Sequence, residues 1–431
     1  MNIFHRVQIF GRDGLFSLQE DQGQIRQIVP WTKDTYGWER ADPLPTQPFR
    51  PGKSSAIWDA AGRLMLPGLV DIHTHLDKAQ TLPFAHNFEG TLLGAINAFR
   101  RYRKQMTVQD VFHRALSTAQ DALSYGTTTL RTHIDAGDPI EIQLPIVLEG
   151  LAQVKHTLKD RMDIQVVVMC PAELSCQDFK TLASCCPGQI DAMGGAPHLS
   201  SQPQKNIENI LALATMRHIP VDVHIDETLD PHVRTLEMLA ESVRTTEFSR
   251  PVVAGHCVSL GAMPWTDARP IIDKVAAADI HVVTLPATNL YLQGREDHAG
   301  VRRGVTRVKE LQQAGVLVAA ASDNIQDAFH PFGQGDVLNA ALLTAYTAHF
   351  GEEDAGRLLK MVSTIPGRMA IHPHYGIHVG EDADWVILDA KSPLEVLQKM
   401  PTQRWVFKKG RLVSMRLVQK WQSDETLNSS I

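Results

Sequence analysis

Two histidines separated by one residue, His73 and His75, close a mostly apolar stretch of the sequence that begins at Leu66. Side chains two positions apart in a β-strand point to the same face, so both imidazoles would project together from the end of such a strand. Imidazole is the side chain that most often binds transition metals in proteins. The spacing therefore predicts part of a metal site, and the alternative is two histidines that lie close together by chance.

Imidazole and carboxylate side chains recur after other apolar stretches of the chain. They are His133 with Asp135, His224 with Asp226 and Glu227, His256, and Asp323 with Asn324. One buried histidine is usually a satisfied core residue, whereas a repeated pattern of this kind favours a single shared site. Three imidazoles and a carboxylate suit a divalent ion, zinc or iron(II). Such an ion lowers the pKa of a bound water to about 7 and so supplies hydroxide at neutral pH.

Eight apolar segments alternate with helical segments and would position these side chains. The predicted strands comprise residues 68–75, 127–135, 163–170, 190–197, 220–226, 251–256, 280–285 and 316–322. Residues 108–124 and 204–217 are examples of the helices between them. Eight β-then-α units in series predict an α/β fold of the (β/α)8 TIM barrel type, which carries its chemistry at the C-terminal ends of the strands. An open doubly wound sheet is the alternative, but no glycine-rich nucleotide motif follows the first strand.

The fourth predicted strand bears on the number of metal ions. Two-metal barrels need a bridging ligand, often a modified lysine from that strand, and residues 190–197 contain no lysine. We therefore expect one divalent metal ion, with a coordination position left open for water.

The two ends of the chain predict a second, smaller unit. Residues 7–10 and 25–29 read as strands near the N-terminus, and residues 384–389 and 405–413 form a similar pair near the C-terminus. We expect residues 1–65 together with 373–431 to form a small β-sandwich domain, and residues 66–372 to form the metal-dependent barrel.

Composition narrows the class of protein and its partners. The 431 residues carry a formal net charge of -6 and are 43% hydrophobic and 21% charged, which is typical of a globular protein. No long basic run is present, so nucleic acid is not an expected partner. No apolar stretch approaches the roughly 20 residues of a membrane span, and the five cysteines are too sparse for a disulfide framework. These features predict a cytoplasmic protein with no membrane partner, and they leave a homo-oligomer open.

Four segments of the sequence carry a resemblance to a known family. They are RTHID at residues 131–135, VDVHIDE at 221–227, LQGR at 292–295 and RRGVTRVKE at 302–310. Together with the paired histidines, they resemble the amidohydrolase superfamily, and within it the cytosine deaminase group and its triazine aminohydrolase relatives. The resemblance extends over nearly the whole chain.

The resemblance implies a role for each candidate site residue. The metal ligands would be His73, His75, His224 and Asp323. Glu227 would shuttle protons, and His256 would orient or polarise the metal-bound hydroxide. Hydroxide would attack an sp2 carbon that bears an amino group, and Asp323 would accept the proton of the water. Glu227 would protonate a ring nitrogen before ammonia leaves.

Departures from that group fall where a substrate would bind. The group has a glutamine after its third strand where Ala172 stands, and a second aspartate where Asn324 follows the metal aspartate. Phe329 takes the place of a pocket tryptophan, and Leu92 fits the apolar wall. We therefore expect Leu92, Asn324 and Phe329 to bind the substrate. Lys78 would contact an anionic or carbonyl group, or else form a surface ion pair.

Three functions remain open at this point. The first is a metal-dependent hydrolytic deaminase of an amino-substituted N-heterocycle, cytosine or a close analogue. The second uses the same metal machinery to cleave an N-alkylamino-triazine or a cyclic amide, and the changed residues Ala172 and Asn324 favour it. The third is a barrel without catalytic activity that serves in assembly, and the presence of every expected ligand argues against it.

Overall fold

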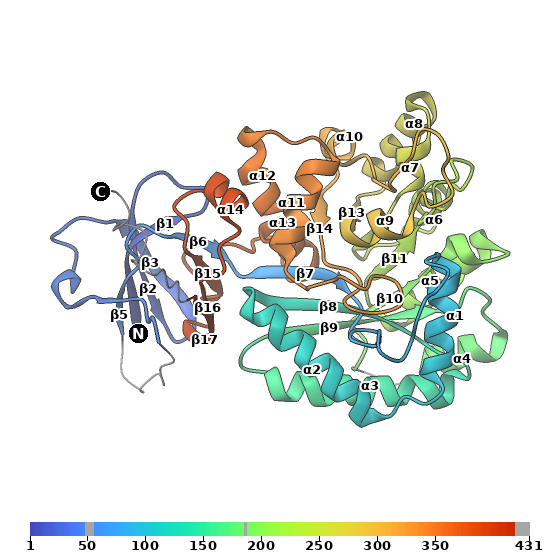
Figure 1. Ribbon diagram of the computed structural model, residues 1–431, viewed down its shortest axis with the longest axis horizontal. Helices are drawn as coiled ribbons and strands as arrows, with labels where there is room; N and C mark the ends of the chain where they lie inside the picture. The colour runs from blue at the N-terminus through green and yellow to red at the C-terminus, as the bar shows by residue number, and fades with distance from the viewer. Residues whose placement is uncertain (48–55, 185–187, 419–431) are drawn as a thin grey trace, which may run out of the picture.

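A barrel and a smaller mixed sheet lie side by side in this protein (Figure 1). The computed structural model describes residues 1–47, 56–184 and 188–418. The smaller sheet is built from both ends of the chain, since the first strands pair with the last ones.

Eight parallel strands form the barrel in the described part of the chain. In chain order they are β7 (Leu69–Thr74), β8 (Thr127–Asp135), β9 (Asp163–Cys170), β10 (Ala192–Gly195), β11 (Val221–Ile225), β12 (Val252–His256), β13 (Ile280–Thr284) and β14 (Val318–Ala320). Each strand pairs with the next in sequence. The barrel closes between β14 and β7, where the N–H of Asp323 donates to the carbonyl oxygen of His73 at 2.9 Å. This closure confirms the predicted (β/α)8 fold and excludes the open sheet.

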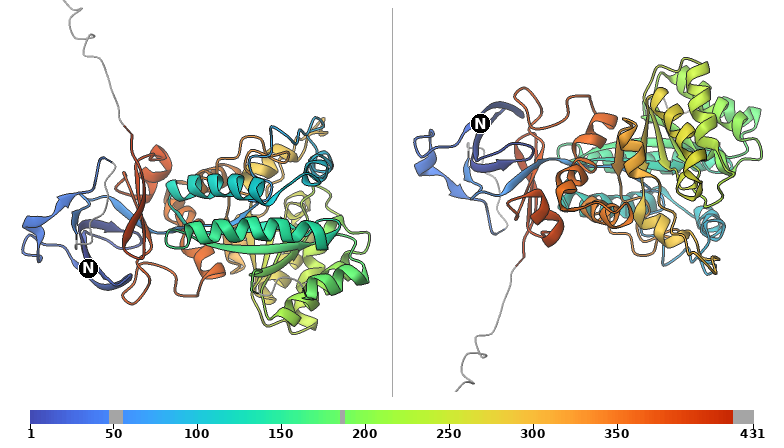
Figure 2. Two further views of the ribbon diagram at one scale, coloured as in Figure 1. Left: turned by 90° about the horizontal axis from the view of Figure 1, so that it is seen from below. Right: turned by 90° about the horizontal axis from the view of Figure 1, so that it is seen from above.

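Helices lie on both sides of the strands in the two views of Figure 2. The longer ones are α1 (Leu92–Arg103), α2 (Val108–Ser124), α3 (Ile140–Leu158), α4 (Cys176–Ser184), α5 (Pro203–Arg217), α6 (Thr235–Thr245), α8 (Trp265–Ala277) and α11 (Val337–Thr347). The shorter ones are α7 (Ser259–Ala262), α9 (Pro286–Leu292), α10 (Val308–Gln313), α12 (Ala355–Lys360), α13 (Thr364–Ala370) and α14 (Pro393–Lys399).

The sequence of α2 shows why these segments are helical and amphipathic. Val111, Ala115, Ala119 and Ala122 recur three or four residues apart and are fully buried, so one face of the helix packs against the barrel. The side chain of Thr107 caps the helix by accepting the N–H of Asp110 at 3.2 Å. Among the described residues, no helix combines the length and the apolar composition needed to cross a bilayer.

A nine-stranded mixed sheet makes up the smaller unit within the described residues. Its strands are β1 (Asn2–Ile9), β2 (Phe16–Asp21), β3 (Gln24–Pro30), β4 (Asp42–Pro43), β5 (Ile57–Asp59), β6 (Leu64–Pro67), β15 (Trp385–Leu388), β16 (Arg404–Lys408) and β17 (Arg411–Arg416). β1 pairs first with β2 and β5 and then with β6, so the sheet folds over one core. In that core, Phe4 meets Trp385 and Phe407 edge to face, at centroid separations of 5.1 and 5.0 Å. The predicted small β domain of N- and C-terminal segments is confirmed.

The chain passes from the small sheet to the barrel within one residue. β6 belongs to the small sheet and β7 to the barrel, with Gly68 between them. A Cβ at Gly68 would lie 2.0 Å from Oγ1 of Thr128, so the crossing requires glycine. We propose the division expected from the sequence, residues 66–372 against 1–65 with 373–431, although β6 continues to Pro67. Residues 48–55 and 419–431 of the small domain lie outside the described residues.

Lys408 joins the two units from a buried position at the end of β16. Its Nζ lies 2.6 Å from Oδ2 of Asp163, at the start of β9, and it donates to the buried carboxylate of Asp384. A buried ammonium group needs charged partners, and Lys408 has two. The pair with Asp384 lies within the small domain, and the pair with Asp163 joins that domain to the barrel.

We expect Lys408→Met to lower the free energy of unfolding by about 3–5 kcal/mol, because the buried carboxylate of Asp384 loses its partner. Urea denaturation measures the loss. The adjacent Lys409 is exposed, so Lys409→Met serves as the matched control and should change stability by no more than about 0.5 kcal/mol. Equal effects of the two substitutions would contradict a special role for Lys408.

Candidate metal centre

Three imidazoles and one carboxylate converge at the C-terminal ends of the barrel strands. His73 is in β7 with His75 just after it, His224 is in β11, and Asp323 lies just beyond β14. Nε2 of His224 lies 3.1 Å from Nε2 of both His73 and His75. Oδ1 of Asp323 lies 3.3 Å from Nε2 of His75 and 3.8 Å from Nε2 of His73. The structure thus brings together all four side chains that the sequence suggested as metal ligands.

The hydrogen bonding of this cluster fits a divalent cation. Nδ1 of His75 donates to the carbonyl oxygen of His133 at 2.9 Å, which leaves the Nε2 lone pair free to face the cluster. Both carboxylate oxygens of Asp323 are buried, and neither has a hydrogen-bond donor among the described residues. Ligand atoms about 2.0–2.1 Å from one zinc ion lie about 3.0–3.4 Å from each other. The observed separations of 3.1, 3.3 and 3.8 Å are close to that range.

The backbone at the junction of β7 and β14 holds Asp323 against the histidines. Asp323 has a left-handed φ of 63°, which a non-glycine residue keeps only where its surroundings fix it. The N–H of Asp323 donates to the carbonyl oxygen of His73 at 2.9 Å. The carbonyl oxygen of Asp323 accepts from Oγ1 of Thr74, also at 2.9 Å. The Asp71 carboxylate accepts from the N–H and the hydroxyl group of Ser322. These bonds connect Asp323 to the strand that carries His73.

Burial sets the charge states in the cluster. It lowers the pKa of His73 and of His224 well below the ordinary value, and the neighbouring imidazoles add to this effect. Burial opposes ionisation of Asp323, but the neighbouring imidazoles of His75 and His256 hold the pKa of this carboxyl group below its ordinary value. Neutral imidazoles and an ionised carboxylate are the forms that bind a metal.

His133 packs against the cluster and is not one of its four side chains. Its ring stacks on that of His73 at a centroid separation of 3.9 Å, and its Nε2 lies 3.1 Å from Oδ1 of Asp222. Oδ2 of Asp222 accepts from Arg131 at 2.7 Å. The side chains of His133, Asp222 and Arg131 therefore form a buried polar group that packs against the ring of His73.

Glu227 and His256 lie beside the cluster. Nδ1 of His256 donates to Oδ1 of Asn289 at 3.0 Å and lies 3.7 Å from Oε1 of Glu227. Nε2 of His256 is buried and has no hydrogen-bond partner among the described residues. Burial raises the pKa of Glu227, against the opposing influence of His256. The pair can therefore hold and transfer a proton next to the cluster.

Two of the expected substrate residues lie on segments that are tied together. Leu92 is the first residue of α1, Phe329 lies between β14 and α11, and both are half-buried. Asn87 donates to the carbonyl oxygens of Thr91 and Ala328, at 2.9 and 3.0 Å, which joins the two segments. Contact of Leu92 and Phe329 with a substrate stays a prediction.

Asn324 and Ala172, two positions that depart from the cytosine deaminase pattern, are fixed by neighbouring side chains. Asn324 is buried, and its Nδ2 donates to Oδ2 of Asp327 at 2.8 Å. The carbonyl oxygen of Ala172 accepts from Nδ2 of Asn206 at 2.9 Å. Substrate binding by Asn324 also stays a prediction.

Lys78 is buried, so the alternative of an ion pair on the surface was wrong in its location, and its contact with an anionic or carbonyl group stays a prediction. The side chain is buried, with Nζ 3.4 Å from Oδ2 of Asp77 and 3.5 Å from Oδ2 of Asp135. Nζ also lies 3.3 Å from Nδ1 of His75. Lys78 is therefore a buried neighbour of the candidate metal ligand His75.

Asp71 and Gly255 support the site but were not found from the sequence, and Asp226 was named there only as a polar residue at a strand end, without a role. The two aspartates are acidic residues in or directly after an apolar strand, and that signal could have marked them as buried and bonded. Gly255 gives no such signal. A Cβ built at this glycine would lie 2.9 Å from Cε1 and 3.1 Å from Nδ1 of His73.

We expect Gly255→Ala to weaken metal binding by about 10–100-fold, the usual effect of disturbing the surroundings of a metal ligand. The added methyl group would push the His73 ring away from the cluster. Competition with a chelator measures the affinity. Gly356→Ala in α12 is the control, because a Cβ there meets nothing within 4 Å. Equal affinities for the two variants would contradict this account of His73.

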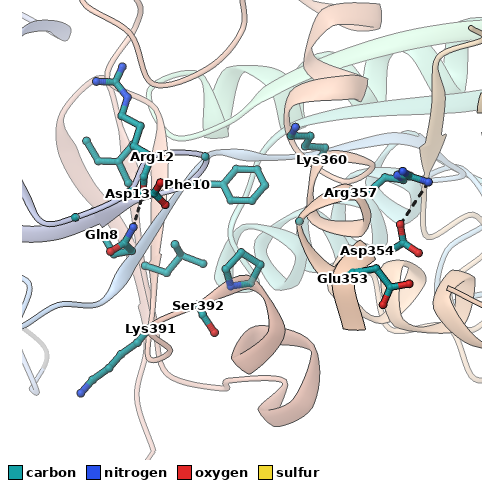
Figure 3. A pocket seen from close by; sticks show the side chains of 16 residues that line it. Gln8, Phe10, Arg12, Asp13, Glu353, Asp354, Arg357, Lys360, Lys391 and Ser392 are labelled. Carbon is teal, nitrogen blue, oxygen red and sulfur yellow. Dashed lines mark hydrogen bonds and ion pairs between the residues drawn. The ribbon is translucent and has the colours of Figure 1, made fainter. Parts of the chain in front are cut away.

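A surface cavity of about 730 Å³ lies away from this cluster (Figure 3). It is lined by the β1–β2 turn, α12 and the segment before α14, at the junction of the two units. Arg12, Asp13, Arg357 and Lys391 are among its side chains, and Arg357 pairs with Asp354 at 3.4 Å. None of the predicted site residues lines it.

The chain belongs to the amidohydrolase family, whose family model matches residues 166–413. It is a hydrolase of carbon–nitrogen bonds other than peptide bonds, in agreement with the resemblance seen in the sequence.

Two named proteins and one crystal structure are similar to this chain over most of their length. Pterin deaminase of Rhizobium rhizogenes is 31% identical over 376 residues, which are 86% of this chain and 85% of that protein. N-isopropylammelide isopropyl amidohydrolase of a Pseudomonas species is 28% identical over 82% of this chain and 87% of that protein. The crystal structure of 5-methylcytosine deaminase from Klebsiella pneumoniae with 5-fluorocytosine superposes with a TM-score of 0.86. It shares 27% identity, with 98% of this chain and 100% of that chain covered.

Proposed function

We propose that the protein is a metal-dependent hydrolytic deaminase of an amino-substituted N-heterocycle. The observation that carries the proposal is the cluster of three imidazole Nε2 atoms and the Asp323 carboxylate, with Glu227 and His256 beside it. Cytosine and its close analogues are the first substrates to test. The likeness to a pterin deaminase extends the class to an amino-oxo-pyrimidine ring that is fused to a second ring.

The residues divide the work of the reaction among them. His73, His75, His224 and Asp323 would hold a divalent ion, and its positive charge would lower the pKa of a water molecule. The Asp323 carboxylate is free of hydrogen-bond donors among the described residues and can accept a proton from that water. Glu227, buried and with a raised pKa, can protonate a ring nitrogen of the substrate. Because Nδ1 of His256 donates to Asn289, its unpaired Nε2 can accept a hydrogen bond from the attacking water and orient it.

A second candidate is hydrolysis of an N-alkylamino bond on a triazine ring, or of a cyclic amide. The likeness to N-isopropylammelide isopropyl amidohydrolase and the unusual residues Ala172 and Asn324 favour it. The two candidates differ in the leaving group, which is ammonia in the first and an alkylamine in the second.

A substrate panel with product identification tests the proposal. Protein loaded with zinc or iron(II) is assayed for ammonia release from cytosine, 5-methylcytosine, pterin and amino-triazines, and for alkylamine release from N-alkylamino-triazines. Release of ammonia from an amino-pyrimidine or a pterin is expected. Release of alkylamine alone would transfer the assignment to the second candidate, and no turnover of any member would refute the proposal.

The proposal has three further parts. The metal ion is zinc or iron(II), the protein is cytoplasmic, and self-association is left open. The ligand set suits either ion. Metal analysis of protein purified without chelator and size-exclusion chromatography test the ion and the assembly.

A further inference from the structure

Asp226 stands between a candidate metal ligand and the candidate proton shuttle. It follows β11, two residues after His224 and directly before Glu227. It is buried, and its backbone is left-handed, with a φ of 51°. A non-glycine residue keeps this conformation only where surrounding contacts hold it, and such residues gather at functional sites.

The carboxylate of Asp226 receives hydrogen bonds from two helices. Oδ1 accepts the N–H of Thr235 at 3.0 Å and also its hydroxyl group. Oδ2 accepts the N–H of Leu236 at 3.1 Å and the hydroxyl group of Ser259 at 3.2 Å. Thr235 and Leu236 open α6, and Ser259 opens α7. With these donors in place, the carboxylate has little capacity left for a metal ion or a substrate.

The backbone of Asp226 is bonded to the segment that carries His256. Its carbonyl oxygen accepts the N–H of Val258 at 3.0 Å and of Ser259 at 3.2 Å. His256 and Cys257 are left-handed as well, with φ of 68° and 52°. Asp226 therefore links the strand end that carries Glu227 to the strand end that carries His256.

We propose that Asp226 is a positioning residue that fixes the Glu227 carboxylate relative to the His256 imidazole. The inference rests on the proposed function, because it assumes that these two groups act together in the reaction. Oε1 of Glu227 and Nδ1 of His256 lie 3.7 Å apart in the structure, and the loops that set this separation meet at the side chain of Asp226. A simple helix cap is the competing role, since α6 has no capping bond from the side chain of Arg234, the residue before it.

Asp226→Asn separates the two roles. An amide has one oxygen and one donor group, so at least one of the present donors faces an NH2 group in the variant. We expect kcat to fall about 100-fold, the effect of misplacing a catalytic group by about 1 Å, while KM changes less than about twofold because Asp226 touches no substrate. A crystal structure of the metal-loaded variant should show Glu227 displaced from His256.

Ser392→Ala controls for the loss of a helix cap. Ser392 caps α14, away from the predicted site residues, by accepting the N–H of Glu395 at 3.2 Å. The Ser392→Ala substitution should lower the melting temperature and leave kcat unchanged. Ser259→Ala gives a milder test if Asp226→Asn does not fold. It leaves the donors of α6 in place, and we expect a loss of about fivefold in kcat, the worth of one hydrogen bond.

The outcomes divide clearly. A displaced Glu227 with a reduced kcat supports the inference. An unmoved Glu227, or a displaced Glu227 with normal kcat, overturns it. If the wild-type protein deaminates nothing on the panel, the proposed function fails, and the crystal structure of the variant alone decides whether Asp226 positions Glu227.

Discussion

Glu227→Gln is expected to lower kcat by about 10²–10⁴-fold, the usual contribution of a general acid–base group. The carboxyl group is buried next to His256, and burial raises its pKa, so it is suited to hold a proton and release it to a ring nitrogen. Glutamine keeps the shape of the side chain but cannot transfer that proton. Metal content should be unchanged, because Glu227 is not part of the imidazole cluster.

The measurement is steady-state kinetics on whichever substrate the panel identifies, together with metal analysis of each protein. Glu208→Gln on α5 is the matched control, because this side chain is exposed and far from the cluster in the fold. It should leave kcat unchanged. A Glu227→Gln enzyme with a kcat within about fivefold of the wild type would remove Glu227 from the mechanism, since a general acid–base group contributes far more.

The barrel strands could be predicted because parallel strands that are buried on both faces are almost continuous apolar runs. Every predicted segment contains a strand of the barrel. Residues 190–197 and 316–322 were predicted too long, since they contain only β10 and β14. Pro197 has no N–H and begins a 3-10 helix after β10. After β14 the chain leaves the strand and turns left-handed at Asp323.

The site could be predicted within each strand but not between strands. The two-residue spacing of His73 and His75 fixes a common face, whatever the rest of the fold does. His133 and His256 look alike in the sequence, because both lie at or near the C-terminal end of a predicted barrel strand. Only the closed barrel shows that His133 stacks beneath His73 while His256 reaches Asn289.

Long-range ion pairs were the other feature that the sequence could not give. Lys78 follows the histidine pair in a segment that reads as a loop, and loop lysines are mostly exposed. Its partner Asp135 comes from the next strand, so the pair exists only once β7 and β8 are adjacent. The hydrogen bond between Asp71 and Ser322 could not be predicted for the same reason, because the two residues meet only where the barrel closes.

His224→Ala is expected to abolish tight metal binding, whereas His133→Ala should retain it. Nε2 of His224 lies 3.1 Å from Nε2 of both His73 and His75, so its removal takes away one of the four candidate ligands. The loss should exceed the roughly 100-fold effect of removing a hydrogen-bonding partner of a ligand. The side chain of His133 contacts Asp222 and the face of His73, and only its backbone carbonyl oxygen bonds His75.

The pair is well matched because both residues are buried histidines inside the barrel, and each substitution leaves a similar cavity. Metal content and thermal unfolding with and without chelator are measured for each. A bound ion at 1,000 times its Kd stabilises the fold by about 4.1 kcal/mol, so the chelator should lower the melting temperature of the wild type and of His133→Ala. It should have no effect on His224→Ala. Metal retained by His224→Ala and lost by His133→Ala would instead place the ion among His73, His133 and Asp222, whose ligand atoms lie within 4.8 Å of one another.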